Sequence, residues 1–170
     1  YMYRGGLASF GGAAFVTDGG VAHCISSELS DNMVSRGSFA GGGAFFGWKG
    51  SQIILHGTSL LRNRAEKPSG NALGGGILLI MAALQMIDAN VAGNVAKGAG
   101  RHALGGAIYA VNRSQVVLKR VKVIGNSARE SVSGCSDGGA MRVEEHCTVH
   151  VQHCTFTGNV AADSGDWAGG

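Results

Sequence analysis

The sequence has little charge, almost no proline and few aromatic residues. Asp, Glu, Lys and Arg make up 15% of the 170 residues, where about 25% is usual, and Pro68 is the only proline. So little proline excludes a collagen-like chain. The 30 glycines argue against long helices, because an interior glycine costs a helix about 1 kcal/mol relative to alanine. Hydrophobic residues still amount to 45%, so the chain can bury a core, and we expect one domain over residues 1–170.

Basic runs and long apolar segments are also absent. The net charge is +3 and no stretch contains five consecutive basic residues, so we expect no nucleic-acid partner. The longest apolar segment, residues 77–87, is mostly hydrophobic but well short of the ~20 residues that cross a bilayer. We therefore expect no transmembrane segment and assign residues 77–87 to the buried core.

What the sequence does contain is an internal repeat. A Gly-Gly pair recurs at spacings of 31, 33, 30, 33 and 31 residues, and an asparagine follows each of the first five pairs. The pairs are Gly11-Gly12, Gly42-Gly43, Gly75-Gly76, Gly105-Gly106, Gly138-Gly139 and Gly169-Gly170. The asparagines are Asn32, Asn63, Asn94, Asn126 and Asn159. Two landmarks that stay in step through five units indicate a repeat architecture.

Short alternating patterns within each unit predict β-strands. In residues 116–123, apolar side chains stand at Val116, Leu118, Val121 and Val123, a period of two interrupted by one extra residue. A further short strand is expected after each Gly-Gly pair, which gives three strands per unit and leaves no segment for a crossover helix. Because such repeats stack, we predict an all-β fold, a parallel β-solenoid of about five turns with loops on one edge.

Stacked turns would place equivalent residues in files along the axis. Leu55, Met86, Leu118 and Val151 are expected in one interior file. The five asparagines are expected at one inner corner, as a structural ladder whose amides hydrogen-bond along the axis and satisfy backbone groups at the bend. The glycine pairs would supply the backbone freedom needed to re-enter the sheet.

Two short motifs resemble those of a known family. Residues 105–108, Gly-Gly-Ala-Ile, and residues 156–159, Phe-Thr-Gly-Asn, resemble the paired GGA[ILV] and FxxN motifs of polymorphic outer-membrane protein repeats, which belong to bacterial surface adhesins. The resemblance covers residues 11–170, with Leu or Val at the Phe position of the other units. It implies a right-handed parallel β-helix of the pectin-lyase-like superfamily and an adhesive or structural role at a cell surface.

A carbohydrate-active enzyme is the main alternative on such a fold. Polysaccharide hydrolases need two carboxylates, and lyases need a basic residue near a calcium site, but no outward file stacks two acids. Asp88 beside Arg120 is the nearest candidate, and we interpret the two as a surface ion pair. Ice binding, a further alternative, needs a regular hydroxyl face, whereas the outward files mix Ile, His, Gln, Lys and Val. We therefore predict no catalytic residues and keep a polysaccharide lyase or hydrolase as the runner-up.

Residues 146–154 contain three histidines and two cysteines, which are metal-ligand types. The strand pattern places Cys154 inward and His150 outward, and ligands on opposite faces of a sheet cannot share an ion. We therefore expect no metal and no cofactor, and read Cys24 and Cys154 as small buried hydrophobic residues. Cys135 and Cys147 lie in turns, and a disulfide between them stays open.

The segments between each asparagine and the next glycine pair vary in length and sequence. We expect them to form loops along one edge, over residues 33–41, 64–74, 95–104, 127–137 and 160–168. Loops on a rigid scaffold are where repeat proteins place recognition residues. The candidate binding ridge on these loops consists of Arg36, Arg64, Lys67, Lys97, Arg101, Arg129 and Trp167.

The sequence as a whole predicts a non-enzymatic structural or adhesive segment that presents this ridge to protein or glycan partners, at a cell surface or within a larger assembly. Neither end has the polar cap that the end turns of a solenoid need, which indicates a segment of a longer rod or one covered by partners. The glycosylation tripeptide Asn112-Arg113-Ser114 fits an extracellular location.

Overall fold

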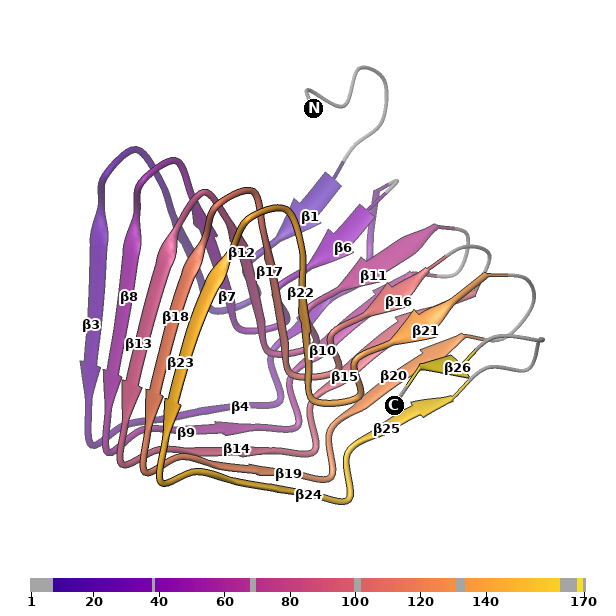
Figure 1. Cartoon of the computed structure of the whole chain (residues 1–170). Helices are drawn as coiled ribbons and strands as arrows, with labels where there is room; N and C mark the ends of the chain where they lie inside the picture. The colour runs from indigo at the N-terminus through magenta and orange to yellow at the C-terminus, as the bar shows by residue number, and fades with distance from the viewer. Residues whose placement is uncertain are drawn as a thin grey trace.

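The computed structural model describes residues 8–37, 39–67, 70–99, 102–130, 134–162 and 168–169. In this part of the chain the regular structure is entirely β-strand, in sets of five strands per coil (Figure 1). Each strand pairs in parallel with its equivalents in the neighbouring coils, so five sheets, A to E in chain order, run along the axis. The predicted all-β parallel solenoid of about five turns is confirmed. No helix among these residues is long and apolar enough to cross a membrane.

Sheets A, B and C contain sixteen of the strands. Sheet A consists of β1 (Ala8–Phe10), β6 (Phe39–Gly41), β11 (Asn71–Leu73), β16 (Ala103–Leu104), β21 (Ser136–Asp137) and β26 (Ala168–Gly169). Sheet B consists of β2 (Ala14–Val16), β7 (Phe45–Trp48), β12 (Ile77–Ile80), β17 (Ile108–Val111) and β22 (Met141–Val143). Sheet C consists of β3 (Val21–Ile25), β8 (Gln52–His56), β13 (Ala83–Ile87), β18 (Gln115–Lys119) and β23 (Thr148–Gln152).

Sheets D and E complete each coil. Sheet D consists of β4 (Glu28–Ser30), β9 (Ser59–Leu61), β14 (Asn90–Ala92), β19 (Lys122–Ile124) and β24 (Thr155–Thr157). Sheet E consists of β5 (Met33–Val34), β10 (Arg64–Lys67), β15 (Val95–Gly98), β20 (Ser127–Glu130) and β25 (Val160–Ala162). Figure 1 shows sheets B, C and D around a wide interior, with sheets E and A on the other side of the coil.

The interior enclosed by sheets B, C and D is the main hydrophobic core. The predicted file is confirmed, because Leu55, Met86, Leu118 and Val151 occupy equivalent places on adjacent strands of sheet C. The first three of these side chains are at most 1% exposed. Residues 77–87 form β12 and β13, as expected for a buried segment of the solenoid.

The prediction of three strands per unit is wrong. The segments expected to be loops form most of sheets E and A, which adds two strands to every coil. Their facing side chains are small: Ala65 and Ala96 of sheet E form a separate buried cluster with Ala40 and Ala72 of sheet A. Alanine is a poor strand former in isolation, so these strands depend on packing against each other. For the same reason, the sequence pattern of these segments resembles that of polar loops.

Sheet A is also covered on its other face. Phe10 and Leu73 of sheet A pack against Phe46, Leu78 and Tyr109 on the outward side of sheet B. The rings of Phe10 and Phe46 stack with centroids 4.4 Å apart. Sheet A therefore lies between the alanine cluster and this aromatic cluster.

The predicted asparagine ladder is confirmed. The side-chain oxygen of Asn94 accepts hydrogen bonds from the backbone N–H and the amide of Asn63, at 3.0 and 2.9 Å. The amide of Asn94 in turn donates to Asn126 Oδ1 and to the carbonyl of Leu60. The same pattern runs from Asn32 to Asn159. Asn63, Asn94 and Asn126 have no exposed surface, so the ladder satisfies buried polar groups at the corner between sheets D and E.

The glycine pairs lie against this same corner and form a neck between the two parts of the coil. A Cβ added at Gly106 would lie 2.5 Å from the carbonyl carbon of Ser127 and 2.6 Å from its nitrogen, and closer still to the carbonyl oxygen of Gly139. Equivalent contacts occur at Gly43 and Gly75. The second glycine of each pair is therefore required by close backbone approach, and the first, such as Gly105 with φ of 65°, by the turn.

The register of the third unit differs from the prediction. Gly74, with φ of 60°, occupies the place of the first glycine, and Gly75 makes the neck contacts, so the structural pair is Gly74-Gly75 and not Gly75-Gly76. Counted from Gly74, the distance to Asn94 is 20 residues, one fewer than the 21 from Gly105 to Asn126. The missing residue lies in the turn between sheets B and C, where Met81 stands alone in the left-handed region.

The ladder predicts a large effect of substitution at its centre. Asn94→Ala removes an amide that makes hydrogen bonds in both directions and leaves buried partners unsatisfied, so we expect a loss of at least about 2 kcal/mol in the free energy of unfolding. Asn90→Ala, on the outward face of β14, should change it by less than about 0.5 kcal/mol. Urea denaturation measures both, and similar losses would contradict the role assigned to the ladder.

The neck predicts that two glycines respond differently to alanine. Gly106→Ala should cost more than about 3 kcal/mol, because the methyl group would overlap backbone atoms that cannot move apart. Gly125→Ala should cost about 1 kcal/mol, because Gly125 has φ of 60° but open space around its Cβ position. The midpoints of thermal unfolding test this order, and the reverse order would show that conformational freedom is the dominant requirement.

Candidate functional site

Four of the predicted ridge residues, Arg64, Lys67, Lys97 and Arg129, lie on strands rather than on loops. Arg64, Lys97 and Arg129 belong to β10, β15 and β20 and are exposed on the outward face of sheet E. Lys97 is paired in register with Arg129 on one side and with Glu66 on the other. The strand register therefore brings charged residues into one file that the sequence had placed in separate loops.

Lys97 and Arg129 are the basic members of this file. Arg64 forms an ion pair with Glu66 at 3.3 Å, whereas no ion pair joins Lys97 or Arg129 to any residue in the described part of the chain. We call Lys97 and Arg129 the sheet-E cation pair. Adjacent strands are about 4.8 Å apart, so the sheet itself sets the spacing of the two side chains.

Arg36 and Lys67 do not belong to the file of Lys97 and Arg129, since Lys67 pairs with Gly98. Arg36 is exposed after β5, and Lys67 is half-buried at the end of β10. Arg101 and Trp167 lie outside the described residues. In the part of the chain that the structure describes, strands occupy most of the predicted loop segments.

Asp88 and Arg120 form the expected ion pair at the corner between sheets C and D. Arg120 donates two hydrogen bonds to the Asp88 carboxylate, one of them at 2.7 Å, and His56 Nε2 lies 3.5 Å from the same carboxylate. The hydrogen bond from Arg120 lowers the pKa of Asp88. The side chains of Asp88, Arg120 and His56 are all exposed, as expected for a surface ion pair.

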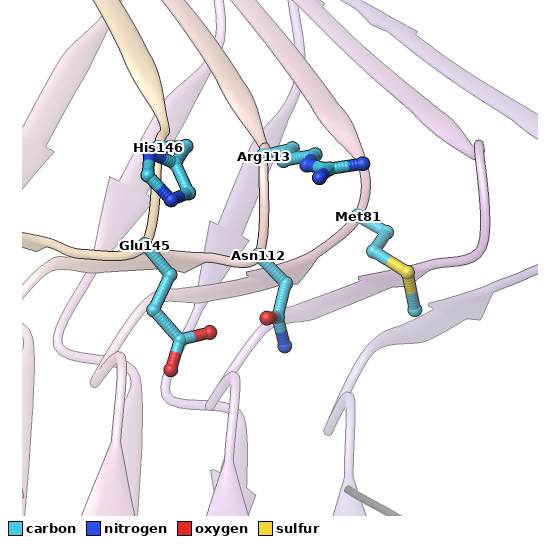
Figure 2. A pocket seen from close by; sticks show the side chains of 5 residues that line it. All are labelled: Met81, Asn112, Arg113, Glu145 and His146. Carbon is cyan, nitrogen blue, oxygen red and sulfur yellow. The ribbon is translucent and has the colours of Figure 1, made fainter.

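A hollow lies at the turns between sheets B and C (Figure 2). Met81, Asn112, Arg113, Glu145 and His146 line it and come from three successive coils. The shorter turn of the third coil, with Met81 alone where its neighbours have two residues, leaves room beside Asn112 and Arg113. The residues were not identified as a site from the sequence, because the shortened turn is visible only once the strand register is known.

This hollow is also a place of unfavourable backbone geometry. Arg113 and His146 adopt φ of 59° and 61°, in the left-handed region, which costs a non-glycine residue about 1–2 kcal/mol. Their equivalents in the first two coils are Gly19 and Gly50. The two C-terminal coils thus place charged or polar side chains where glycine would be the less strained residue.

A second polar cluster lies beside the hollow, on the outward face of sheet B. Arg142 contacts Glu144 at 2.6 Å and Asp137 at 3.0 Å, and the Tyr109 hydroxyl donates to Glu144 at 2.7 Å. Burial of the phenol and its hydrogen bond to Glu144 raise the pKa of Tyr109 above its ordinary value. These residues link sheets A and B at the last coils, where the aromatic packing ends.

The strand faces predicted for Cys24, Cys154 and His150 are confirmed, although the two thiols are only partly buried. Cys24 and Cys154 pack against the main core, and burial raises the pKa of the Cys24 thiol. His150 is exposed on the opposite face of sheet C. All four cysteines are free thiols, so Cys135 and Cys147 are not bridged. Within the described ranges, no group of three or more His, Cys, Asp or Glu side chains could hold a metal ion.

Comparisons with protein families, with curated proteins and with solved structures found no match to this chain. The fold and the geometry of its surfaces are therefore what bears on function.

The strained turns generate a test of what their side chains do. Arg113→Gly and His146→Gly should each raise the free energy of unfolding by about 1 kcal/mol, because glycine adopts this backbone conformation without strain. Lys119→Gly, within strand β18, should lower it by about 1 kcal/mol. Chemical denaturation of the three variants checks this, and a loss of stability in Arg113→Gly would show that the arginine side chain itself stabilises the turn.

Proposed function

We propose that this chain is a non-enzymatic structural or adhesive segment, a stiff β-solenoid that contacts an acidic protein or glycan through the outward face of sheet E. The observation that supports the proposal is the sheet-E cation pair, two exposed basic side chains held at strand spacing with no ion-pair partner among the described residues. The role follows from a rigid scaffold that presents charge at a defined spacing.

The scaffold favours binding over chemistry at this face. Backbone hydrogen bonds along sheet E hold Lys97 and Arg129 in register. Binding of a ligand with regularly spaced negative charges therefore costs the protein little conformational entropy. Both cations are exposed. Their attraction for a ligand should therefore weaken as the ionic strength rises above about 0.1 M, where the Debye length falls below about 10 Å.

The resemblance to polymorphic outer-membrane protein repeats supports the same role. Residues 105–108 contain the neck glycine Gly106 and the first residue of β17. Residues 156–159 end with the ladder asparagine Asn159. Both motifs therefore coincide with contacts that shape the coil. We extend the proposal to an extracellular or cell-surface location and to a right-handed, pectin-lyase-like β-helix on this likeness.

A carbohydrate-active enzyme is the second candidate, and one observation favours it. Asp137 and Glu144 are half-buried carboxylates joined through Arg142 and adjacent to Tyr109. Hydrolases of polysaccharides use two carboxylates. Here the carboxylates are engaged by Arg142 and Tyr109, an arrangement that also serves to join sheets A and B, so we rank this candidate second.

Binding of dextran sulfate, with neutral dextran as the ligand control, tests the first proposal. The double variant Lys97→Glu/Arg129→Glu should weaken binding at least about tenfold at low salt, because it replaces attraction by repulsion. Lys122→Glu, at an exposed site on sheet D, is the control and should change binding less than about threefold. Calorimetry at two salt concentrations measures these effects, and equal losses in both variants would contradict a site on sheet E.

Turnover of uronic-acid polymers separates the two candidates. The first proposal expects no release of reducing or unsaturated ends. Activity that is lost in Glu144→Gln, with the fold retained by circular dichroism, would replace it with the enzymatic one.

A further inference from the structure

The hollow at the turns between sheets B and C combines a cavity with strained residues. Its volume is about 390 Å³, within the range of small-molecule sites. All five lining residues are non-glycine residues in the left-handed region, with φ between 52° and 61°. Such a conformation favours glycine, which the first two coils have in these turns at Gly19 and Gly50. Because strained residues gather where their side chains are used, the hollow is a candidate ligand site.

Arg113 and Glu145 have opposite charges but do not pair with each other. The N–H of Arg113 donates to the carbonyl of Glu145 at 2.8 Å, so their turns are in direct contact. Between these two described side chains there is no ion pair. Figure 2 shows Arg113 extending over the turn of Met81, while Glu145 points to the side of Asn112. The hollow therefore has a cation and an anion available to a ligand. Elsewhere in the described coils, left-handed cations do pair with a left-handed acid one coil before them: Lys49 with Asp18, Arg62 with Asp31 and Arg120 with Asp88.

The backbone beside the hollow is fixed by hydrogen bonds between coils. The hydroxyl of Ser114 accepts the N–H of Ala82 at 3.2 Å and donates to the carbonyl of Val111 at 2.7 Å, and Ser114 has no exposed surface. These bonds join the shortened turn at Met81 to the turn that presents Arg113. Since the backbone is already ordered, a ligand does not have to order it on binding.

The side chains of the hollow define the chemistry of a ligand. A guanidinium such as that of Arg113 binds a carboxylate through two parallel hydrogen bonds, and the carboxylate of Glu145 accepts hydrogen bonds from an ammonium group. Met81 is 45% exposed and offers an apolar contact. A ligand with only negative charge would be repelled by Glu145, and one with only positive charge by Arg113. The combination therefore favours a small zwitterion with an apolar part.

We propose that the hollow binds a free α-amino acid with an apolar side chain. The carboxylate of the ligand pairs with Arg113, its ammonium group pairs with Glu145, and its side chain lies against Met81. The two charged groups of an α-amino acid are on one carbon, a spacing that suits side chains from neighbouring turns about 4.8 Å apart. A residue within a peptide has lost both charges to amide bonds, and a chain terminus has lost one of them. The site is separate from the sheet-E cation pair, since sheet E lies on the other side of the coil (Figure 1).

Binding of L-leucine, followed by the NMR chemical shifts of the backbone amides, tests the proposal. The chain is produced without N-glycosylation, because Asn112 belongs to a glycosylation tripeptide. We expect the amides of residues 81, 112–113 and 145–146 to shift with a dissociation constant on the order of 1 mM, since Arg113 and Glu145 are exposed. Isocaproate, which lacks the ammonium group, and isoamylamine, which lacks the carboxylate, should bind at least about tenfold more weakly.

Two variants separate loss of a ligand contact from loss of the fold. Arg113→Gly removes the guanidinium and relieves the backbone strain, so it should bind leucine at least about tenfold more weakly while its midpoint of unfolding rises. Glu145→Gln should weaken binding at least about fivefold. As controls, Lys122→Gln, at an exposed site on sheet D, and the double variant Lys97→Glu/Arg129→Glu should bind leucine within about twofold of the unchanged chain.

Three results would overturn the proposal. The first is leucine binding that is retained in Arg113→Gly, with the same amides shifting. The second is isocaproate that binds as tightly as leucine, because the hollow would then select an anion alone. The third is the absence of shifts at these amides with leucine at about fifty times the expected dissociation constant.

Discussion

The close approach of two backbone segments at the neck is the constraint on which the rest of the coil depends. At each turn the second glycine of a pair lies against the residue that follows the ladder asparagine, as Gly106 does against Ser127. No side chain fits there, and the buried corner beside it needs an amide to satisfy the backbone. Glycine and asparagine therefore recur together because they occupy the two sides of one contact.

This constraint divides the cross-section into two parts with different requirements. Sheets B, C and D enclose large apolar side chains such as Met86 and Leu118, whereas sheets E and A approach closely over alanines such as Ala65 and Ala72. The outward positions of either part are unconstrained by the neck, so charge can vary from coil to coil. The cation pair on sheet E and the polar cluster around Arg142 both use this freedom, on faces held rigid by the strand ladders.

The turns between sheets B and C are the other place where coils differ. They lie far from the neck in the chain path of each coil, and they tolerate a one-residue deletion at Met81 as well as left-handed Arg113 and His146. Packing of the flanking strands β17 and β18 maintains these turns against their local strain. Variation in this solenoid is therefore concentrated in turns and outward faces, while the neck and the two interiors keep one pattern.

The sequence by itself determined the repeat, the interior file of sheet C, the asparagine ladder and the Asp88–Arg120 pair, because each follows from residues that recur at the period of the coil. Only the tertiary structure decided that the predicted loops are sheets E and A, that the third glycine pair begins at Gly74, and that Lys97 lies beside Arg129. The physical reason is that alanine-rich strands have weak local preference and form only against a partner sheet. Which surface residues of different coils become neighbours likewise depends on strand register. A change of one residue in a turn shifts this register without altering the local sequence pattern of the strands.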